Sequence, residues 1–298
     1  SMIIYGQGAI RSHPYLLKEM TALQSDDKAG FDIYLWKHIF NVFSNLTRCF
    51  LLGLSIKTGL IKLSNSRIET LAQAKLTYLS AAFSLTSDIA LATYGGALKR
   101  KEMVSGRFAD AFSWIYLACG ALKRHHDAKE RDMEPILEWS IQTACHNAHE
   151  AILGNIDNLP NPFIRILIKI ISSPLGLRFK LPDDKLTSTV AASILDGDKR
   201  REILSNDVFV PGKDDPALGR LEQALKLAED SLPLKKKLRI ARKEGKINAR
   251  YGEMMIAEGL EAKIITDKEA TELRKYDKLV LDVINVDDFD VATYKTLK

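Results

Sequence analysis

The sequence predicts an all-α fold, a bundle of long helices followed by shorter helices. Apolar residues recur at steps of three and four along most of the 298 residues, which is the spacing of one helix face. Glycine and proline are few, at 17 and 9, so long stretches run without a strong helix breaker. No segment has a convincing strand pattern, and only the apolar run "LVLDVINV" leaves a short strand open.

The first long helix is expected over residues 31–60, where a narrow apolar stripe repeats. Its most apolar part, residues 40–60, is interrupted by Asn45, Arg48 and Lys57. A membrane span needs about 20 predominantly apolar residues. We therefore expect a buried helix and not a spanning one. The stripe consists of Phe31, Leu35, Ile39, Val42, Leu46, Cys49, Gly53, Ile56 and Leu60.

The second helix is expected over residues 71–92, after a turn at "KLSNSR". Many of its stripe positions are alanine, which lets a neighbouring helix approach closely, as in a bundle. Gly95 and Gly96 follow, and because the good helix formers of "ALKRKEM" come next, we expect a close helix contact at these glycines and not a helix end.

The third and fourth helices are expected at about residues 104–128 and 133–157. Pro135 stands near the start of the fourth, where a missing N–H group costs little. Beyond the prolines of the following segment come shorter helices, for which Ser231, Thr266 and Asp267 are candidate N-caps. These helices are expected at about residues 186–194, 216–228, 233–244, 248–258 and 267–281.

A short helix at residues 163–173 is bounded by prolines and almost wholly apolar, with Arg165 and Lys169 as its one polar stripe. At about 1.5 Å per residue it is too short to cross a bilayer. It is either a core helix with two surfacing cations or a helix lying in a membrane interface. The candidate membrane-contact residues are Phe163, Arg165, Leu167, Lys169, Ile170, Arg178 and Lys180.

Composition excludes several classes of protein. A net charge of +5 permits contact with phosphate or anionic lipid without demanding it. Three cysteines lie in apolar helical patterns without a close pair, so we expect buried structural thiols and a reducing compartment. No signal peptide pattern opens the chain. The basic run from Lys235 to Arg250 lacks interleaved aromatic residues, so nucleic-acid binding is not predicted; a solvated face is favoured, and an acidic partner stays open.

No motif supplies a complete active site. "GQGAIR" has Arg11 where a dinucleotide loop needs its third glycine, and no strand precedes it. "CHNAHE" places His146, His149 and Glu150 within two turns of one helix, but no second copy provides the further ligands of a metal bundle. Polar residues on a bundle helix are favoured there, and metal-dependent chemistry is the weaker alternative. The sequence therefore predicts no catalytic, cofactor-binding or metal-binding residue.

Several stretches together are similar to the C-terminal part of the large bacterial, FadE-type fatty-acyl-CoA dehydrogenases. The long third stretch is the most specific, and the similarity extends from the first residues to the last. The stretches are "MIIYGQGAIRSHPYLLKEM", "FDIYLWKHIFNVFSN", "SDIALATYGGALKRKEMVSGRFADAFSWIYLACGALKRHHD" and "INVDDFD".

This resemblance implies a whole enzyme that oxidises acyl-CoA at Cα and Cβ with FAD, in the first step of fatty-acid β-oxidation. The catalytic glutamate and the flavin domain would precede Ser1, so the fragment is expected to be inactive alone and to hold no cofactor. The implied partners are its own N-terminal catalytic core, a second subunit, the inner membrane reached from the cytoplasm, acyl-CoA and an electron-transfer flavoprotein.

On this interpretation residues 1–12 end the catalytic helical domain and residues 13–158 form the long-helix bundle. Residues 159–184 are the proline-bounded segment, and residues 185–298 are a helical region packed on the bundle. The expected role is accessory: to support core stability, dimerisation or membrane association. The alternative is a freestanding helical interaction protein that binds an acidic partner through its basic face.

Overall fold

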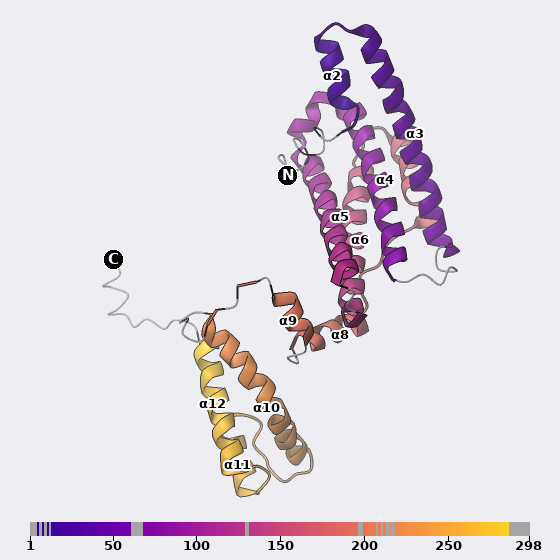
Figure 1. Cartoon of the computed structure of the whole chain (residues 1–298). Coiled ribbons are helices and arrows are strands. Elements are labelled where there is room, and N and C mark those ends of the chain that lie inside the picture. The colour runs from indigo at the N-terminus through magenta and orange to yellow at the C-terminus, as the bar shows by residue number, and fades with distance from the viewer. Residues whose placement is uncertain are drawn as a thin grey trace. The chain divides into compact units, whose positions relative to one another are not determined.

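The fold is all-α, as predicted, and the chain divides into two units, residues 1–190 and 191–298 (Figure 1). The computed structural model describes the following residues: 5, 8, 11, 13–60, 68–128, 131–195, 199–206, 208–209, 211–212, 215 and 218–285. Within them every regular element is a helix. The part of "LVLDVINV" that is described, residues 279–285, continues a helix to Ile284, so the structure has no strand there.

The first unit holds the long helices that the apolar periodicity predicts, together with one short helix that it missed, α2. Its helices are α2 (Leu16–Gln24), α3 (Lys28–Thr58), α4 (Ile68–Tyr94), α5 (Glu102–Ala128), α6 (Glu134–Asp157) and α7 (Pro162–Ser172). Short 3₁₀ turns are η3 (Gly95–Arg100), η4 (Arg131–Met133) and η5 (Pro174–Gly176). The helix α8 (Asp184–Leu195) crosses the boundary between the units.

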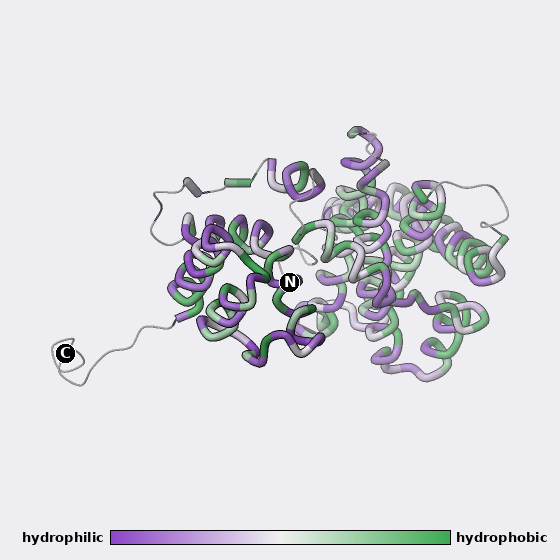
Figure 2. Tube along the Cα trace, turned by 90° about the horizontal axis from the view of Figure 1, so that it is seen from below, coloured by the Kyte–Doolittle hydropathy of each residue, from purple (hydrophilic) through white to green (hydrophobic). Residues whose placement is uncertain are grey.

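The second unit contains α9 (Lys199–Ser205), α10 (Gly219–Lys243), α11 (Gly252–Glu261) and α12 (Asp267–Ile284). Its core is formed where α10, α11 and α12 bring Leu238, Ile256 and Leu273 together. In both units hydrophobic and hydrophilic positions alternate around the helices (Figure 2), the pattern expected of helices that pack on one side. How the last region packs against the bundle stays a prediction.

Alanine allows close packing in the first unit, as the second predicted helix suggested. The central helices α4, α5 and α6 pack on one another, and α3 lies against α4 at an edge (Figure 1). Fully buried alanines line these contacts, among them Ala82, Ala111 and Ala148. Small side chains let helix axes approach and bring larger residues from neighbouring turns into contact.

Two expectations about helix ends were wrong. Gly95 ends α4 with a left-handed φ of +51°, and a Cβ added at Gly95 or Gly96 would have no atom within 4 Å, so no close helix contact exists there. Ser231 is not an N-cap, because α10 runs through it and through Pro233. Buried residues on both sides of Pro233, Ala224 before it and Leu234 and Leu238 after it, hold this helix together despite the proline.

Other terminal signals were read correctly. Pro135 occupies the first turn of α6. Thr266 caps α12 in a reciprocal capping box with Glu269, whose carboxylate accepts the Thr266 backbone N–H at 2.8 Å. The "KLSNSR" turn lies outside the described residues.

The expectation that the first long helix is buried was wrong for its outer side. Only the side of α3 that carries Asn45, Cys49 and Gly53 is buried. By length and composition α3 is, among the described residues, the one helix that would be able to cross a membrane, a criterion that core helices also meet. Periodicity was correct about most of the inner stripe, although its members Ile39 and Leu60 are 46 and 59% exposed. The outer side carries a second apolar stripe.

Gly53 offers a test of the packing of α3. A Cβ there would lie 2.9 Å from Pro174 and 3.0 Å from Tyr78, so we expect Gly53→Ala to destabilise the first unit by about 1–3 kcal/mol through overpacking. The matched control is Gly120→Ala in α5, where a Cβ meets nothing within 4 Å; there we expect a gain of about 0.5–1 kcal/mol. Urea unfolding followed by tryptophan fluorescence measures both. Equal effects at the two positions would contradict the close contact.

Candidate functional site

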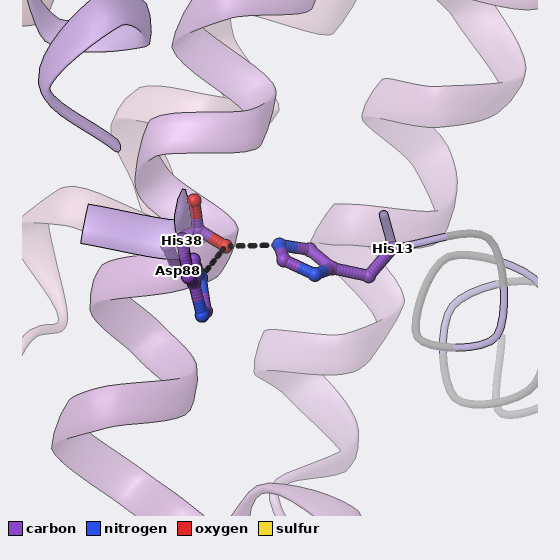
Figure 3. Close-up of side chains that lie close together, drawn as sticks. All are labelled: His13, His38 and Asp88. Carbon is purple, nitrogen blue, oxygen red and sulfur yellow. Dashed lines mark hydrogen bonds and ion pairs between the residues drawn. The ribbon is translucent and has the colours of Figure 1, made fainter. Parts of the chain in front are cut away.

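A cluster of four titratable side chains joins the start of the first unit to α3 and α4. His13 precedes α2, Glu19 lies in α2, His38 in α3 and Asp88 in α4. The Nε2 atom of His13 lies 3.1 Å from Oδ1 of Asp88, and Nε2 of His38 lies 3.6 Å from the same oxygen (Figure 3). On its other side, His38 Nδ1 lies 2.8 Å from Oε1 of Glu19. Both carboxylates are buried.

Hydrogen bonds assign the protons of both imidazoles. Nδ1 of His13 accepts the backbone N–H groups of Tyr15 and Leu16, at 3.3 and 3.0 Å, so the ring proton is on Nε2, which donates to Asp88. Nδ1 of His38 donates to Glu19. Nε2 of His38 and Oδ2 of Asp88 are buried without a hydrogen-bond partner among the described residues.

The donor atoms of His13, His38 and Asp88 all lie within 4.8 Å of one another, so these three residues are able to hold one metal ion. The cluster was not predicted from the sequence. The three residues are 25 and 50 positions apart, and no short motif links them. The one available signal was polar residues standing inside apolar helical patterns.

A second feature is an apolar surface that we call the α3–α7 face. On α3, Trp36, Phe40 and Phe43 are 62, 72 and 66% exposed. Aromatic side chains carry about 150–250 Å² each, so these three alone leave roughly 400 Å² in solvent. Soluble monomers rarely expose a larger apolar patch. Further exposed members are Ile33, Ile39, Phe50 and Leu51 on α3, and Phe163, Ile166, Leu167 and Ile170 on α7.

Packing aligns the two helices that form this face. Cys49 Sγ lies 3.9 Å from the Ile171 carbonyl oxygen, Gly53 meets Pro174, and Lys57 Nζ donates to the Gly176 carbonyl at 3.3 Å. Residue numbers increase in the same direction on both sides, so α7 runs parallel to α3 and ends opposite Cys49. At 1.5 Å per residue, the start of α7 then lies beside the middle of α3. The exposed residues of the two helices therefore occupy adjacent parts of one surface.

The predicted membrane-contact residues divide into apolar and basic groups on the structure. Phe163, Leu167 and Ile170 are exposed on α7, while Ile168 and Ile171 fill the core on its other side. The short helix thus has both a core side and an outward side, which the two sequence-based interpretations treated as alternatives.

The basic members of that set differ in how their charge is compensated. Arg165 donates to the carbonyl of Leu159 at 2.8 Å, a neutral acceptor. Lys169 pairs with Asp157 at 2.6 Å, and Arg178 lies 3.9 Å from Glu150. Lys180 is exposed beside buried Phe179. Exposed pairs of this kind contribute little to stability.

The "CHNAHE" residues do not converge on one point. His146 Nδ1 donates to the Phe179 carbonyl at 2.8 Å, and Glu150 faces Arg178. His149 is fully buried on the core side, where its Nε2 lies 3.1 Å from the Tyr78 hydroxyl. Burial lowers the pKa of His149 to about 4, because the charged imidazolium is poorly solvated there.

The basic run of the second unit is partly neutralised. Lys235 lies 3.6 Å from Asp277 and 3.8 Å from the centre of the Tyr276 ring. Lys237 donates to Glu269 at 2.8 Å, which contributes most to lowering the pKa of that carboxylate to about 2. A carboxylate partner already occupies part of the face that an acidic protein would need.

At the start of the chain, Tyr5 is buried in an aromatic stack. Its ring lies 4.5 Å from that of Phe108 in α5, nearly parallel, and 6.4 Å edge-on from Phe83 in α4. Burial raises the pKa of Tyr5 to about 12. Most of "GQGAIR" lies outside the described residues.

Comparison with protein families gives a match to "Acyl-CoA dehydrogenase, C-terminal, bacterial type" over residues 10–289. No solved structure matches the chain. The family match spans both structural units.

The three cysteines should differ in reactivity because one of them is exposed. The expectation of three buried thiols was therefore wrong for Cys119. Cys49 and Cys145 are buried, which raises the pKa of each thiol to about 12, whereas Cys119 is exposed on α5. The thiolate is the reactive form. We expect one thiol per chain to react with Ellman's reagent in native protein and three after unfolding. A fast thiol remaining in Cys119→Ser would contradict this assignment.

His149 should make the first unit less stable in acid. Its pKa is depressed from 6.5 to about 4, so the unfolded chain binds the extra proton first, and stability falls as pH decreases from about 6.5 towards 4. Between pH 7 and 5 this costs about 2 kcal/mol. Urea unfolding at both pH values should show a smaller difference for His149→Gln than for the parent. The control His126→Gln, at an exposed histidine, should retain the parent's difference; an unchanged difference in His149→Gln would contradict the prediction.

Proposed function

The chain belongs to the bacterial-type family of acyl-CoA dehydrogenase C-terminal domains, and we propose that it supports the catalytic core and holds the enzyme at a membrane surface. A C-terminal domain of an acyl-CoA dehydrogenase implies a catalytic core that precedes it as its partner. The observation that carries the proposal is the α3–α7 face, a large apolar surface on a unit that already has a core of its own.

Two surfaces on different helices suit two different partners. The Tyr5 stack fastens the start of the chain to α4 and α5, and α5 also exposes Met103, Tyr116 and Leu117. We assign the catalytic core to this side, because the core joins the domain there. In Figure 1, α3 lies on the other side of α4 from α5, so we assign its exposed side to a second partner.

Charge favours an anionic bilayer as that second partner. Lys57 and Arg165 flank the face, and each donates to a neutral carbonyl; among the described residues neither has a carboxylate within ion-pair distance. A two-fold pairing of this face with a second copy would bring the same cations into one interface. Phosphate headgroups would instead attract them while the aromatic and aliphatic side chains enter the acyl boundary.

Acyl-CoA dehydrogenases generally use FAD, and we assign that cofactor to the catalytic core. A groove of about 470 Å³ on this unit is lined by amides, hydroxyls, Arg48 and apolar side chains such as Leu76 and Ile115, and no aromatic side chain lines it to contact a flavin ring. Oxidation of long acyl-CoA chains, dimerisation, transfer of electrons to a flavoprotein and a cytoplasmic position at the inner membrane complete the proposal for the whole enzyme.

Liposome flotation tests the membrane part of the proposal. We expect the parent chain to float with vesicles containing about one third phosphatidylglycerol, and the double variant Leu167→Asp, Ile170→Asp to remain at the bottom. Two carboxylates on the outer side of α7 oppose both apolar insertion and the anionic surface.

The matched control places the same change on exposed apolar residues of the second unit, Leu232→Asp and Met254→Asp; it should float like the parent. Circular dichroism and tryptophan fluorescence establish that each variant is folded. Membrane attachment through this face is wrong if the folded parent does not float. It is also wrong if the parent floats equally well with neutral vesicles and the α7 variant floats as well as the parent.

A further inference from the structure

We propose that His13, His38 and Asp88 form a binding site for one Zn²⁺ ion, with Glu19 behind His38. This inference goes beyond the proposed function and does not rest on it. The three residues come from the segment before α2, from α3 and from α4, so one ion would cross-link three parts of the chain.

The separations of the two histidine nitrogens from Asp88 suit a zinc ion, and the one to His38 is too long for a hydrogen bond. Tetrahedral zinc with bonds of about 2.0–2.1 Å to nitrogen and oxygen holds its ligand atoms about 3.3 Å apart. Oδ1 of Asp88 lies 3.1 Å from Nε2 of His13 and 3.6 Å from Nε2 of His38. At 3.6 Å a proton between nitrogen and oxygen does not make a hydrogen bond, whereas a metal ion bound to both atoms needs about this distance.

The polar atoms around His38 are arranged as they are behind metal-bound histidines. Its Nδ1–H is held by the carboxylate of Glu19 at 2.8 Å, which orients the ring so that Nε2 faces Asp88. Oδ2 of Asp88 is buried without a hydrogen-bond partner among the described residues, and Asp88 is only 6% exposed. The buried carboxylate of Asp88 faces the Nε2 atoms of both histidines, and a cation bound between them would compensate its charge.

On binding zinc, the ring proton of His13 would move from one nitrogen to the other. Its Nδ1 accepts the N–H groups of Tyr15 and Leu16, so its Nε2 carries the proton that donates to Asp88. Ligation moves the ring proton to Nδ1 and gives up these two contacts at the start of α2. His13 itself lies in the segment before that helix, so binding loosens the start of α2 and not a helix of the bundle.

An access path lies next to the cluster. The groove of about 470 Å³ is lined by Pro14, Asn41 and Ser84. Pro14 adjoins His13, Asn41 is one turn from His38, and Ser84 is one turn from Asp88. The groove therefore comes within a helical turn of the site, and a water molecule from it would complete four-coordination.

Zinc titration of the tag-free, chelator-treated 298-residue chain tests the site, in a Cys119→Ser background that removes the exposed thiol. We expect one Zn²⁺ per chain and a rise in the unfolding temperature on addition of zinc. Glu19→Gln should weaken binding about 10- to 100-fold, and His38→Ala or His13→Ala by more than that. Cobalt at the same site should give visible absorption of the four-coordinate type.

His126→Ala, an exposed histidine away from the cluster, is the matched control and should bind zinc like the parent. Asp88→Asn would also remove a ligand, but Asp88 is buried in α4 and the variant can fail to fold. His13→Ala keeps the test decisive in that case, because His13 stands outside the bundle helices. The proposal is overturned if the parent binds no stoichiometric zinc, or if zinc binds as tightly to His38→Ala and His13→Ala as to the parent. In either case the cluster is held by protons and hydrogen bonds alone.

Discussion

The buried hydroxyl of Tyr78 is the contact on which the first unit depends most. Tyr78 projects from α4, bonds the Ser172 carbonyl at the end of α7 and lies 3.1 Å from His149 in α6. Gly53 of α3 packs directly against its ring. One side chain therefore sets the positions of four helices, and the aligned outer sides of α3 and α7 follow from it. A buried polar residue of this kind specifies an arrangement only when its hydrogen bonds are made.

The helices were predictable because the residues that each helix buries are apolar and recur at helical spacing along the sequence. The apolar stripes of α4, α5 and α6 face one another and are buried. The capping box of α12 is formed by Thr266 and Glu269, whose spacing is visible in the sequence. Periodicity did not predict which side of a helix is buried where the helix carries two apolar stripes. On α3, Leu35, Val42 and Cys49 follow one stripe, while Trp36, Phe40 and Phe43 follow another. Which stripe is covered depends on neighbours that lie far along the chain.

The candidate metal cluster was not predictable for a related reason. His13, His38 and Asp88 converge only because α3 and α4 are antiparallel neighbours and the preceding segment folds back onto them. Metal motifs readable in a sequence place two ligands within a few residues, which these do not. "CHNAHE" has such spacing, yet its histidines point in different directions from α6. Local spacing singled out His146 and His149, which the sequence analysis already interpreted as polar residues of a bundle helix, whereas tertiary contact brings His13, His38 and Asp88 together.

The inner and outer sides of α3 have separate roles. Its inner side is fixed at two places, by His38 at the polar cluster and by Cys49 and Gly53 near Tyr78. Its outer side carries large aromatic residues that contribute nothing to either anchor. An edge helix with only a structural role would gain solubility from polar residues there, since apolar side chains left in water do not stabilise the fold. Retaining Trp36, Phe40 and Phe43 on that side is therefore better explained by a partner that covers them, and the separation of the two sides lets that partner bind without rearranging the bundle.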